Sequence, residues 1–272
     1  MERFAGRVVW ITGASSGIGE ALAHAFAAEG ARVVLSSRRP AELERVRQAL
    51  PRAAEHWCVP LDLAQTASFP GIVAEVLRLA GRIDVLVNNG GVSQRALAVE
   101  ATLEVERALM EVDYFGPVAL TKAVLPAMLA QRAGHVVVVS SVMGYVGTPG
   151  RSTYAAAKHA LHGYFDSLRA EIWRDGIRVT LVCPGYVLTQ VSANAVGPRG
   201  EKHGVTDGTH ERGISPERVA RATLNAIVRG KEEIAIGGTE RWAILLKRLL
   251  PGVASRVIRK MTFSVTPGGR KS

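Results

Sequence analysis

Cysteine is scarce in this chain of 272 residues, which contains only Cys58 and Cys183. The two residues lie far apart in apolar, strand-like contexts, so they predict buried thiols in a reducing compartment rather than a disulfide framework. None of the seven histidines has the spacing of zinc ligands, and no metal site is expected. The fold must therefore depend on a hydrophobic core, and this length suffices for one sizeable domain.

Long apolar runs are also missing. No run reaches the roughly 18 apolar residues that indicate a membrane-spanning helix. The first strand is predicted to begin by about Arg7, which leaves no room for a secretory signal sequence. The sequence therefore predicts a cytoplasmic location, with membrane association left open by the C-terminal segment.

Acidic residues are absent from that segment. The chain carries 34 basic and 24 acidic residues, a net charge of +10, but residues 241–272 contain eight basic residues and no acid. Because the excess is local, it indicates a basic tail rather than a groove for nucleic acid, and no nucleic-acid partner is expected.

The same segment is amphipathic. Apolar residues recur at helical spacing at Trp242, Leu245, Leu246, Leu249 and Val253. Pro251 is expected to kink or split the helix. An apolar stripe flanked only by basic charge suits a peripheral membrane contact, a subunit contact or a cap over a pocket. We therefore separate a basic amphipathic extension, 240–272, from the domain that precedes it, 1–239.

Strand and helix patterns alternate along the first part of the chain. Short apolar runs predict strands at 7–13, 32–37, 56–63, 84–91, 135–141, 177–185 and 232–238. Helices are predicted at 17–30, 41–50, 69–81, 102–132, 152–175 and 215–230. Strands that are apolar without alternation are typical of a parallel sheet covered on both faces. The alternation implies right-handed crossovers and one doubly wound α/β domain.

The first strand ends in a small-residue turn, "TGASSGIG" (12–19), that opens a helix. Small residues let the backbone approach a pyrophosphate, and the helix N-terminus supplies free N–H groups and partial positive charge. Glycines also end strands for steric reasons alone. The position after the first strand nevertheless favours a phosphate site, although the Gly13, Gly17, Gly19 spacing is not the tighter Gly-x-Gly-x-x-Gly form.

This spacing resembles that of the short-chain dehydrogenase/reductase family. Further segments carry the resemblance along residues 7 to about 190: "LDL" (61–63), "NNGG" (88–91), with Gly90 where alanine is usual, and "CPGYVLT" (183–189). The resemblance implies a Rossmann-type, seven-stranded parallel sheet of order 3-2-1-4-5-6-7 with helices on both faces. It also implies a nicotinamide cofactor, a small carbonyl or alcohol substrate, and a homodimer or homotetramer.

The family's catalytic trio has matches at Ser141, Tyr154 and Lys158. "YAAAK" places Tyr154 and Lys158 four residues apart on one helix face, thirteen residues after Ser141. A phenol ordinarily keeps its proton well above neutral pH, and a nearby lysine cation favours the ionised form. The expected roles are proton transfer by Tyr154, tuning and ribose binding by Lys158, and a hydrogen bond from Ser141 to the substrate oxygen.

One position departs from the family. Asp113 stands in the long helix where the family usually has an asparagine that supports a water relay to the lysine. An ionised aspartate only accepts hydrogen bonds, so Asp113 would weaken the influence of Lys158 if the two were paired. Alternatively, its backbone carbonyl supports the same water and catalysis survives, which is the interpretation we favour.

The second strand ends in "SSRR" (36–39), where an NAD site usually has an acid. Ser37 brings no negative charge to repel a 2′-phosphate, and Arg38 offers a planar fork to it. Arg39 either adds a second cation or is solvated at the start of the next helix. This pattern predicts NADP(H). The residues predicted to bind the cofactor are Gly13, Ser15, Ser16, Gly17, Ile18, Gly19, Ser37, Arg38, Arg39, Asp62, Leu63, Asn89, Gly90, Tyr154, Lys158, Pro184, Gly185, Val187 and Thr189.

A glycine-rich polar stretch, 191–213, occupies the place of the family's substrate lid. Segments such as "DYFGPVALTKAVLPAM" resemble a membrane-associated branch of the family, that of member seven-B, which is linked to lipid-type ketones. We therefore expect NADPH-dependent reduction of a lipophilic ketone or aldehyde. The alternatives are an NAD(P)-binding sensor without catalysis and an NAD-dependent alcohol or hydroxysteroid-type dehydrogenase.

Overall fold

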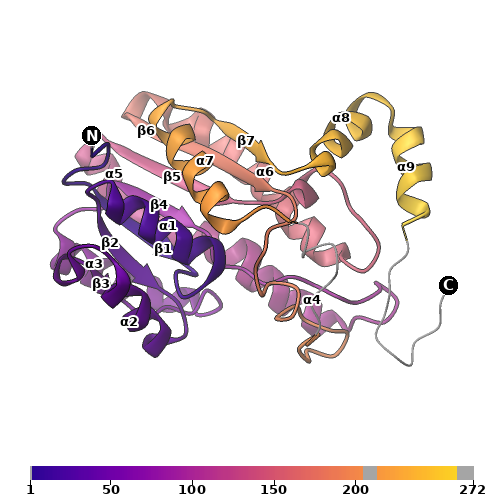
Figure 1. Cartoon of the computed structure of the whole chain (residues 1–272), viewed down its shortest axis with the longest axis horizontal. Coiled ribbons are helices and arrows are strands. Elements are labelled where there is room, and N and C mark those ends of the chain that lie inside the picture. The colour runs from indigo at the N-terminus through magenta and orange to yellow at the C-terminus, as the bar shows by residue number, and fades with distance from the viewer. Residues whose placement is uncertain (1, 205–212, 262–272) are drawn as a thin grey trace.

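Seven parallel strands form the centre of the structure, a computed structural model that describes residues 2–204 and 213–261 (Figure 1). The strands are β1 (Val8–Thr12), β2 (Arg32–Ser36), β3 (Trp57–Cys58), β4 (Val85–Asn88), β5 (Gly134–Val139), β6 (Ile177–Pro184) and β7 (Glu233–Ile236). Their order is β3-β2-β1-β4-β5-β6-β7, which confirms the predicted topology. The strands run in one direction, but the order in which successive strands are added reverses between β1 and β4. Folds of this kind bind ligands at such a switch point.

The third strand is much shorter than the predicted 56–63. Only Trp57 and Cys58 pair in register with β2. The amides of Val59 and Leu61 still donate to backbone carbonyls in β2 and just after it, at 2.9 and 3.1 Å. The chain therefore continues alongside β2 without the regular pairing of a β-strand. Because β3 lies at the sheet edge, Cys58 is only partly buried; the expectation of two buried thiols holds for Cys183 alone.

Helices cover both faces of the sheet in two layers (Figure 1). One layer packs its apolar faces on the first core cluster: α1 (Gly17–Ala28), α2 (Pro40–Ala49) and α7 (Pro216–Val228). The other packs on the second cluster: α3 (Phe69–Ala80), α5 (Gly116–Gln131) and α6 (Ser152–Ile172). Helix α7 begins as expected, because the Ser215 side chain accepts a bond from the Arg218 amide.

The predicted long helix, 102–132, is interrupted. It consists of α4 (Leu103–Met110), a π-helical segment (Glu111–Phe115) and α5. Pro117 has no N–H with which to donate to the Asp113 carbonyl four residues earlier, so regular α-helical bonding fails at this point. π-helical turns often mark functional positions, and this one contains Asp113.

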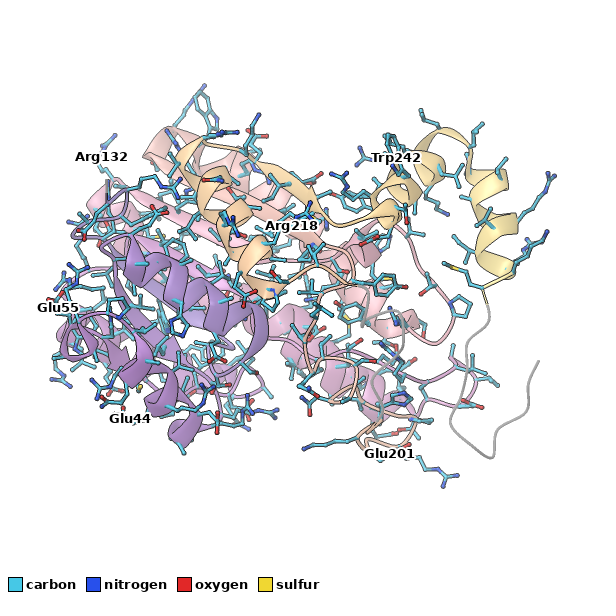
Figure 2. The ribbon with its side chains drawn as sticks, viewed as in Figure 1. Glu44, Glu55, Arg132, Glu201, Arg218 and Trp242 are labelled. Carbon is cyan, nitrogen blue, oxygen red and sulfur yellow. The ribbon has the colours of Figure 1, made fainter. Side chains whose placement is uncertain are left out.

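The C-terminal segment forms two short helices, α8 (Trp242–Leu249) and α9 (Pro251–Arg259), and the predicted split at Pro251 is present. These two helices stand apart from the two helical layers in Figure 1. We call residues 242–261 the C-terminal arm, and Figure 2 labels Trp242 on it. Within residues 2–204 and 213–261, none of the helices is both long and apolar enough to cross a membrane. Residues 262–272 of the predicted extension lie outside the described residues.

We expect Phe165→Ala to lower the free energy of unfolding by about 3–5 kcal/mol, because the ring of Phe165 on α6 is fully buried and its loss leaves a cavity. Denaturant unfolding measures the loss. Trp173→Ala is the matched control: this side chain is 63% exposed, so its removal should change stability by less than about 0.5 kcal/mol. Equal small effects would contradict the packing of α6 described here.

Candidate active site

A cavity of about 560 Å³ lies at the carboxyl ends of the strands. It is lined by the turn after β1, the segments after β2 and β4, and the end of β6. Ser141, Tyr154 and Lys158 line the same cavity. Ligands in doubly wound folds bind at this edge of the sheet. The nucleotide turn and the catalytic trio predicted from the sequence therefore face one continuous space.

Close backbone packing fixes the turn at one end of the cavity. Gly13 has φ +66°, and a Cβ there would lie 2.8 Å from the Cα of Gly90. The Asn89 side chain donates to the Thr12 carbonyl at 2.9 Å, and the Thr12 hydroxyl accepts from the amides of Asn89 and Gly90, both at 3.0 Å. These bonds join the ends of β1 and β4 and hold the turn open toward the cavity.

The departure from the family at Gly90 has a packing reason. A Cβ at this position would lie 2.7 Å from the Leu63 side chain, so alanine would require Leu63 to shift. Gly19 is equally constrained, because a Cβ there would collide with the Gly13 carbonyl. Gly19 does not line the cavity; it lets α1 pack against the turn rather than touching a ligand.

The start of α1 provides donors for an anion. Ser16 is the N-cap residue, but its hydroxyl accepts from Arg39 at 2.9 Å and does not cap the helix. Ser16, Gly17 and Ile18 line the cavity. Backbone N–H groups of a helix's first turn, left without a side-chain cap, suit a pyrophosphate.

Of the two arginines after β2, Arg39 is the one that forms hydrogen bonds to the glycine turn. Its guanidinium donates to the hydroxyls of Ser15 and Ser16, at 2.8 and 2.9 Å. Arg38 lines the same end of the cavity and is exposed, and the Ser37 hydroxyl accepts from the Arg39 amide at 3.1 Å. Both cations thus lie beside Ser37, with no acid at that position.

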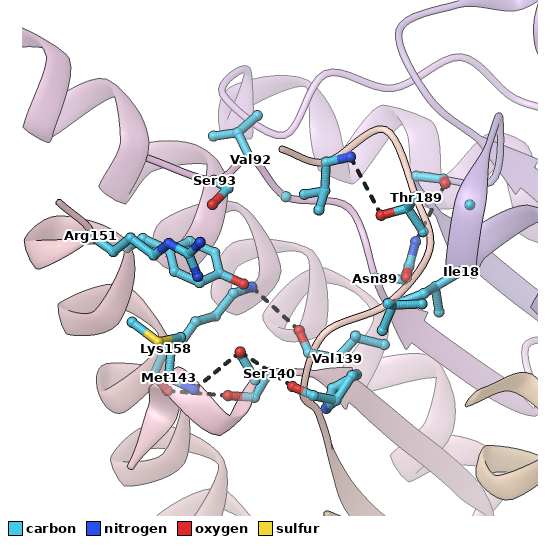
Figure 3. Close-up of a pocket in the computed structure, with 18 of the residues that line it drawn as sticks. Ile18, Asn89, Val92, Ser93, Val139, Ser140, Met143, Arg151, Lys158 and Thr189 are labelled. Carbon is cyan, nitrogen blue, oxygen red and sulfur yellow. Dashed lines mark hydrogen bonds between the residues drawn. The ribbon is translucent and has the colours of Figure 1, made fainter. Parts of the chain in front are cut away.

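Lys158 occupies the centre of the site. The residue is 5% exposed, and its ammonium group donates to the Val139 carbonyl at 3.3 Å (Figure 3). The same group lies 5.5 Å from the centre of the Tyr154 ring. Ser141, at the end of β5, accepts from the Met143 amide at 3.1 Å and makes a long bond to the Pro184 carbonyl, 3.4 Å. Its hydroxyl hydrogen can therefore turn toward a ligand while the oxygen stays fixed.

Asp113 lies behind Lys158 and does not line the cavity. One of its carboxylate oxygens accepts from the Val92 amide at 2.7 Å, and the other lies 3.9 Å from the Lys158 ammonium. Complete burial raises the pKa of the Asp113 carboxyl to about 6, although Lys158 and the Val92 N–H act in the opposite direction. The side chain itself thus faces Lys158, which is the geometry of the pairing alternative that we had not favoured.

The other end of the cavity, beside the C-terminal segment, has apolar walls. Val142, Met143 and Val146 form one wall. Residues of the C-terminal arm form another, namely Ala243, Leu246, Ala254, Val257, Ile258 and Met261. Polar residues also line the cavity, among them Ser93 and Arg151, which Figure 3 labels, and Lys202 and Glu240. The arm therefore covers part of the pocket, whatever else its outer face contacts.

All the predicted site residues except Gly19 and Asp113 line this cavity. Sequence reasoning missed Arg151, whose place depends on contacts between distant segments. The cap over a pocket, one of three options for the C-terminal segment, agrees with the arm residues in the lining. Residues 205–212 of the predicted lid lie outside the described residues, whereas Gln190, Val191, Asn194 and Lys202 of the same stretch line the cavity. The uncapped turn, the two arginines and the buried lysine fit a nicotinamide dinucleotide along this space.

Comparisons with known proteins agree with this geometry. The chain matches the short chain dehydrogenase family over residues 7–199. It is 45% identical over 262 residues to dehydrogenase/reductase SDR family protein 7-like of Anopheles gambiae, covering 94% of this chain and 83% of the relative. It is 43% identical over 259 residues to dehydrogenase/reductase SDR family member 7B of Bos taurus, covering 92% and 80%.

Solved structures give the same result. A short-chain dehydrogenase from Streptomyces avermitilis has a TM-score of 0.78 and 31% identity, covering 93% of this chain and 95% of that chain. A metagenomic short-chain oxidoreductase in complex with NADP has a TM-score of 0.72 and 28% identity, covering 86% and 97%. The chain belongs to the short-chain dehydrogenase/reductase family of NAD(P)-dependent oxidoreductases. Within the family it falls in the branch of the SDR 7 and 7B proteins.

We expect Asp113→Asn to change how stability depends on pH. Because the folded protein holds the Asp113 proton up to a pKa of about 6 and the unfolded chain releases it near 3.8, folding gains stability as the pH falls through this window. The Asn variant lacks this gain. The free energy of unfolding of the parent, relative to the variant, should rise by about 1–3 kcal/mol between about pH 7 and about pH 4.5.

Other titrating groups cancel in that difference, which denaturant unfolding at each pH measures. A difference independent of pH would contradict the burial of an ionisable Asp113.

We also expect the pH–rate profile of Asp113→Asn to differ from that of the parent by less than an order of magnitude. A much larger gain in activity would show that Asp113 impairs the native site.

Proposed function

We propose that the protein is an NADPH-dependent carbonyl reductase that acts on a lipophilic ketone or aldehyde, and reversibly on the alcohol. The observation that carries the proposal is that Ser141, Tyr154 and Lys158 line the same cavity as the uncapped glycine turn. A cofactor with its phosphates at the turn would have room for its nicotinamide beside Tyr154.

Each residue of the catalytic trio has a separate role in the reduction of a carbonyl group. Bound NADPH supplies the hydride. The Ser141 hydroxyl donates to the carbonyl oxygen of the substrate, and its own oxygen is held by the Met143 amide. The Tyr154 hydroxyl gives its proton to that same oxygen as negative charge develops there. The Lys158 ammonium, fixed by the Val139 carbonyl, stabilises the phenolate that remains.

The preference for NADPH over NADH rests on the end of β2. Ser37 carries no charge, and Arg38 and Arg39 both line the cavity there. The Arg39 guanidinium is already oriented by Ser15 and Ser16, so little side-chain entropy remains to be lost when it meets a 2′-phosphate. An NAD-dependent alcohol dehydrogenase, the alternative reading of this fold, would gain nothing from either cation.

A lipophilic substrate is supported by the apolar walls of the end beside the arm, to which the arm itself contributes. We assign residues 191–213 to a lid over this end, 1–239 to the oxidoreductase domain and 240–272 to the extension. A binding protein without catalysis remains a second candidate, and only the carboxylate of Asp113 beside Lys158 favours it.

The outer face of the arm supports peripheral membrane contact. Trp242 and Leu249 are 65% and 74% exposed, and Leu250 and Val253 are also exposed. The basic side chains nearby are Lys247, Arg248, Arg256, Arg259 and Lys260, with no acid from 241 to 261. Apolar side chains among cations suit an anionic lipid surface. We place the protein in the cytoplasm, where free Cys58 and Cys183 stay reduced, with the arm on a membrane.

We further propose a homodimer or homotetramer. Leu103 on α4 and Phe115 in the π-helical segment are 53% and 47% exposed, and together with Met110 they line a shallow surface pocket. Large apolar side chains grouped on one face support a subunit contact there.

Tyr154→Phe should abolish hydride transfer to a panel of lipophilic ketones that the parent reduces with NADPH, because the variant keeps the ring and loses the proton donor. Consumption of NADPH and formation of the alcohol are both followed. Retained cofactor binding by the variant serves as the control. If the variant reduces a ketone as fast as the parent, Tyr154 is not the donor; if the parent reduces none, the binding-protein alternative gains.

Ser37→Asp combined with Arg38→Leu should reverse the cofactor preference. The aspartate repels the 2′-phosphate and the leucine removes one of its cations. We expect the ratio of kcat/KM for NADPH to that for NADH to fall by at least about tenfold, roughly 1.4 kcal/mol. Ratios that agree within twofold between parent and variant would refute the assignment of this segment to the 2′-phosphate.

Leu249→Glu combined with Lys247→Glu should reduce flotation of the full chain with liposomes that contain anionic lipid. The changes place two acids on the outer face of α8, away from the cavity lining. Neutral liposomes should bind the parent more weakly. Equal flotation of parent and variant on both kinds of liposome would remove the membrane assignment and leave the arm as a cover for the pocket.

A further inference from the structure

The helix that carries Tyr154 and Lys158 begins without a cap of its own. Its N-cap residue is Arg151, whose side chain has donors only and so cannot accept from the free N–H groups of the first turn. Such N–H groups must find acceptors elsewhere when they are buried. Thr153 is buried, and Tyr154 is the third residue of the helix. The backbone N–H of the tyrosine is therefore one of the groups that Arg151 leaves without an acceptor.

Gln94 provides that acceptor from a distant part of the chain. Its side-chain oxygen accepts from the amides of Thr153 and Tyr154, at 2.9 and 3.2 Å. These are the second and third helical residues, the two whose N–H groups an N-cap side chain normally binds. Gln94 is fully buried, and its side-chain nitrogen has no partner among the described residues. The hydrogen bonds of this side chain are thus only those that its oxygen accepts.

The backbone around Gln94 joins two sides of the pocket. On one side the segment 93–95 exchanges bonds with Val196 of the proposed lid: Val196 donates to the Ser93 carbonyl at 2.8 Å, and Arg95 donates to the Val196 carbonyl at 2.9 Å. On the other side the Ala96 amide donates to the Gly150 carbonyl at 3.1 Å, just before α6. Gln94 sits between the substrate-covering stretch and the catalytic helix.

We propose that Gln94 is a positioning residue: a remote N-cap of α6 that fixes Tyr154 relative to the backbone at Val196. The inference rests on the proposed function only for its catalytic readout. Gln94 touches neither cofactor nor substrate, since it does not line the cavity. Its effect on the reaction passes through the Tyr154 backbone.

Two variants of the full chain separate capping from packing. Gln94→Met keeps the length and removes the acceptor, and because it also removes an unpartnered buried nitrogen the variant should fold. Gln94→Glu keeps an acceptor, and an anion is favoured at a helix N-terminus. Gln131→Met is the matched control: Gln131 also bonds a distant backbone, at Ile83, but at the other end of the sheet from the cavity.

Amide hydrogen exchange at Thr153 and Tyr154 tests the cap without any substrate. We expect Gln94→Met to accelerate exchange there at least about fivefold, the size of a lost cap, and Gln94→Glu to keep the parental rate. For a ketone that the parent reduces, kcat should fall at least about tenfold in Gln94→Met while both KM values change less than threefold, because a displaced catalytic group affects the chemical step. Gln94→Glu and Gln131→Met should keep kcat within about threefold.

Parental exchange and kcat in Gln94→Met would overturn the proposal, as would a kcat loss that Gln94→Glu shares in full. If the parent reduces no ketone, the proposed function fails while the exchange measurement still decides whether Gln94 caps α6. A loss of kcat in Gln131→Met equal to that in Gln94→Met would assign both effects to general destabilisation and equally overturn the inference.

Discussion

The buried ammonium group of Lys158 constrains the relative positions of the sheet, the π-helical segment and α6. A cation that is 5% exposed needs a hydrogen-bond acceptor and an opposite charge nearby, and separate elements supply them. The Val139 carbonyl at the end of β5 accepts its hydrogen bond, and the carboxylate of Asp113 in the π-helical segment lies 3.9 Å away. The Tyr154 ring, one helical turn before Lys158, faces the same charge. Sheet, π-helical segment and α6 must therefore keep their relative positions for the ammonium group to stay beside the phenol.

Asp113 changes the balance of that arrangement. An asparagine at this place would be neutral at every pH, whereas the Asp113 carboxyl, with a pKa near 6, gains or loses a charge close to neutral pH. The anion is 3.9 Å from Lys158, farther than a direct hydrogen bond, so the lysine still has donors for the Val139 carbonyl and for ribose hydroxyls. We therefore expect the pairing to weaken the electrostatic effect of Lys158 on Tyr154 without removing it, so that catalysis survives with a carboxylate at this position.

Local patterns predicted the sheet and most of the helices, because apolar periodicity and glycine or proline boundaries depend on neighbouring residues. The β-strand order followed from the family resemblance. Periodicity failed at β3, an edge where an extended chain need not pair, and in the long helix, where Pro117 disturbs the bonding of Asp113. The Gln94 cap and the Arg39 contacts were out of reach, since they join residues 59 and 24 positions apart. The burial of Asp113 likewise depends on packing that no single segment encodes.

A crystal structure of the full chain with bound NADP⁺ tests the central claim most directly, namely that one cavity joins the glycine turn to the catalytic trio. We expect pyrophosphate oxygens on the N–H groups at the start of α1, the 2′-phosphate between Arg38 and Arg39, and the nicotinamide end beside Tyr154, with its ribose hydroxyls on Lys158. A cofactor bound elsewhere, or one whose nicotinamide end lies away from Tyr154 and Lys158, would contradict it.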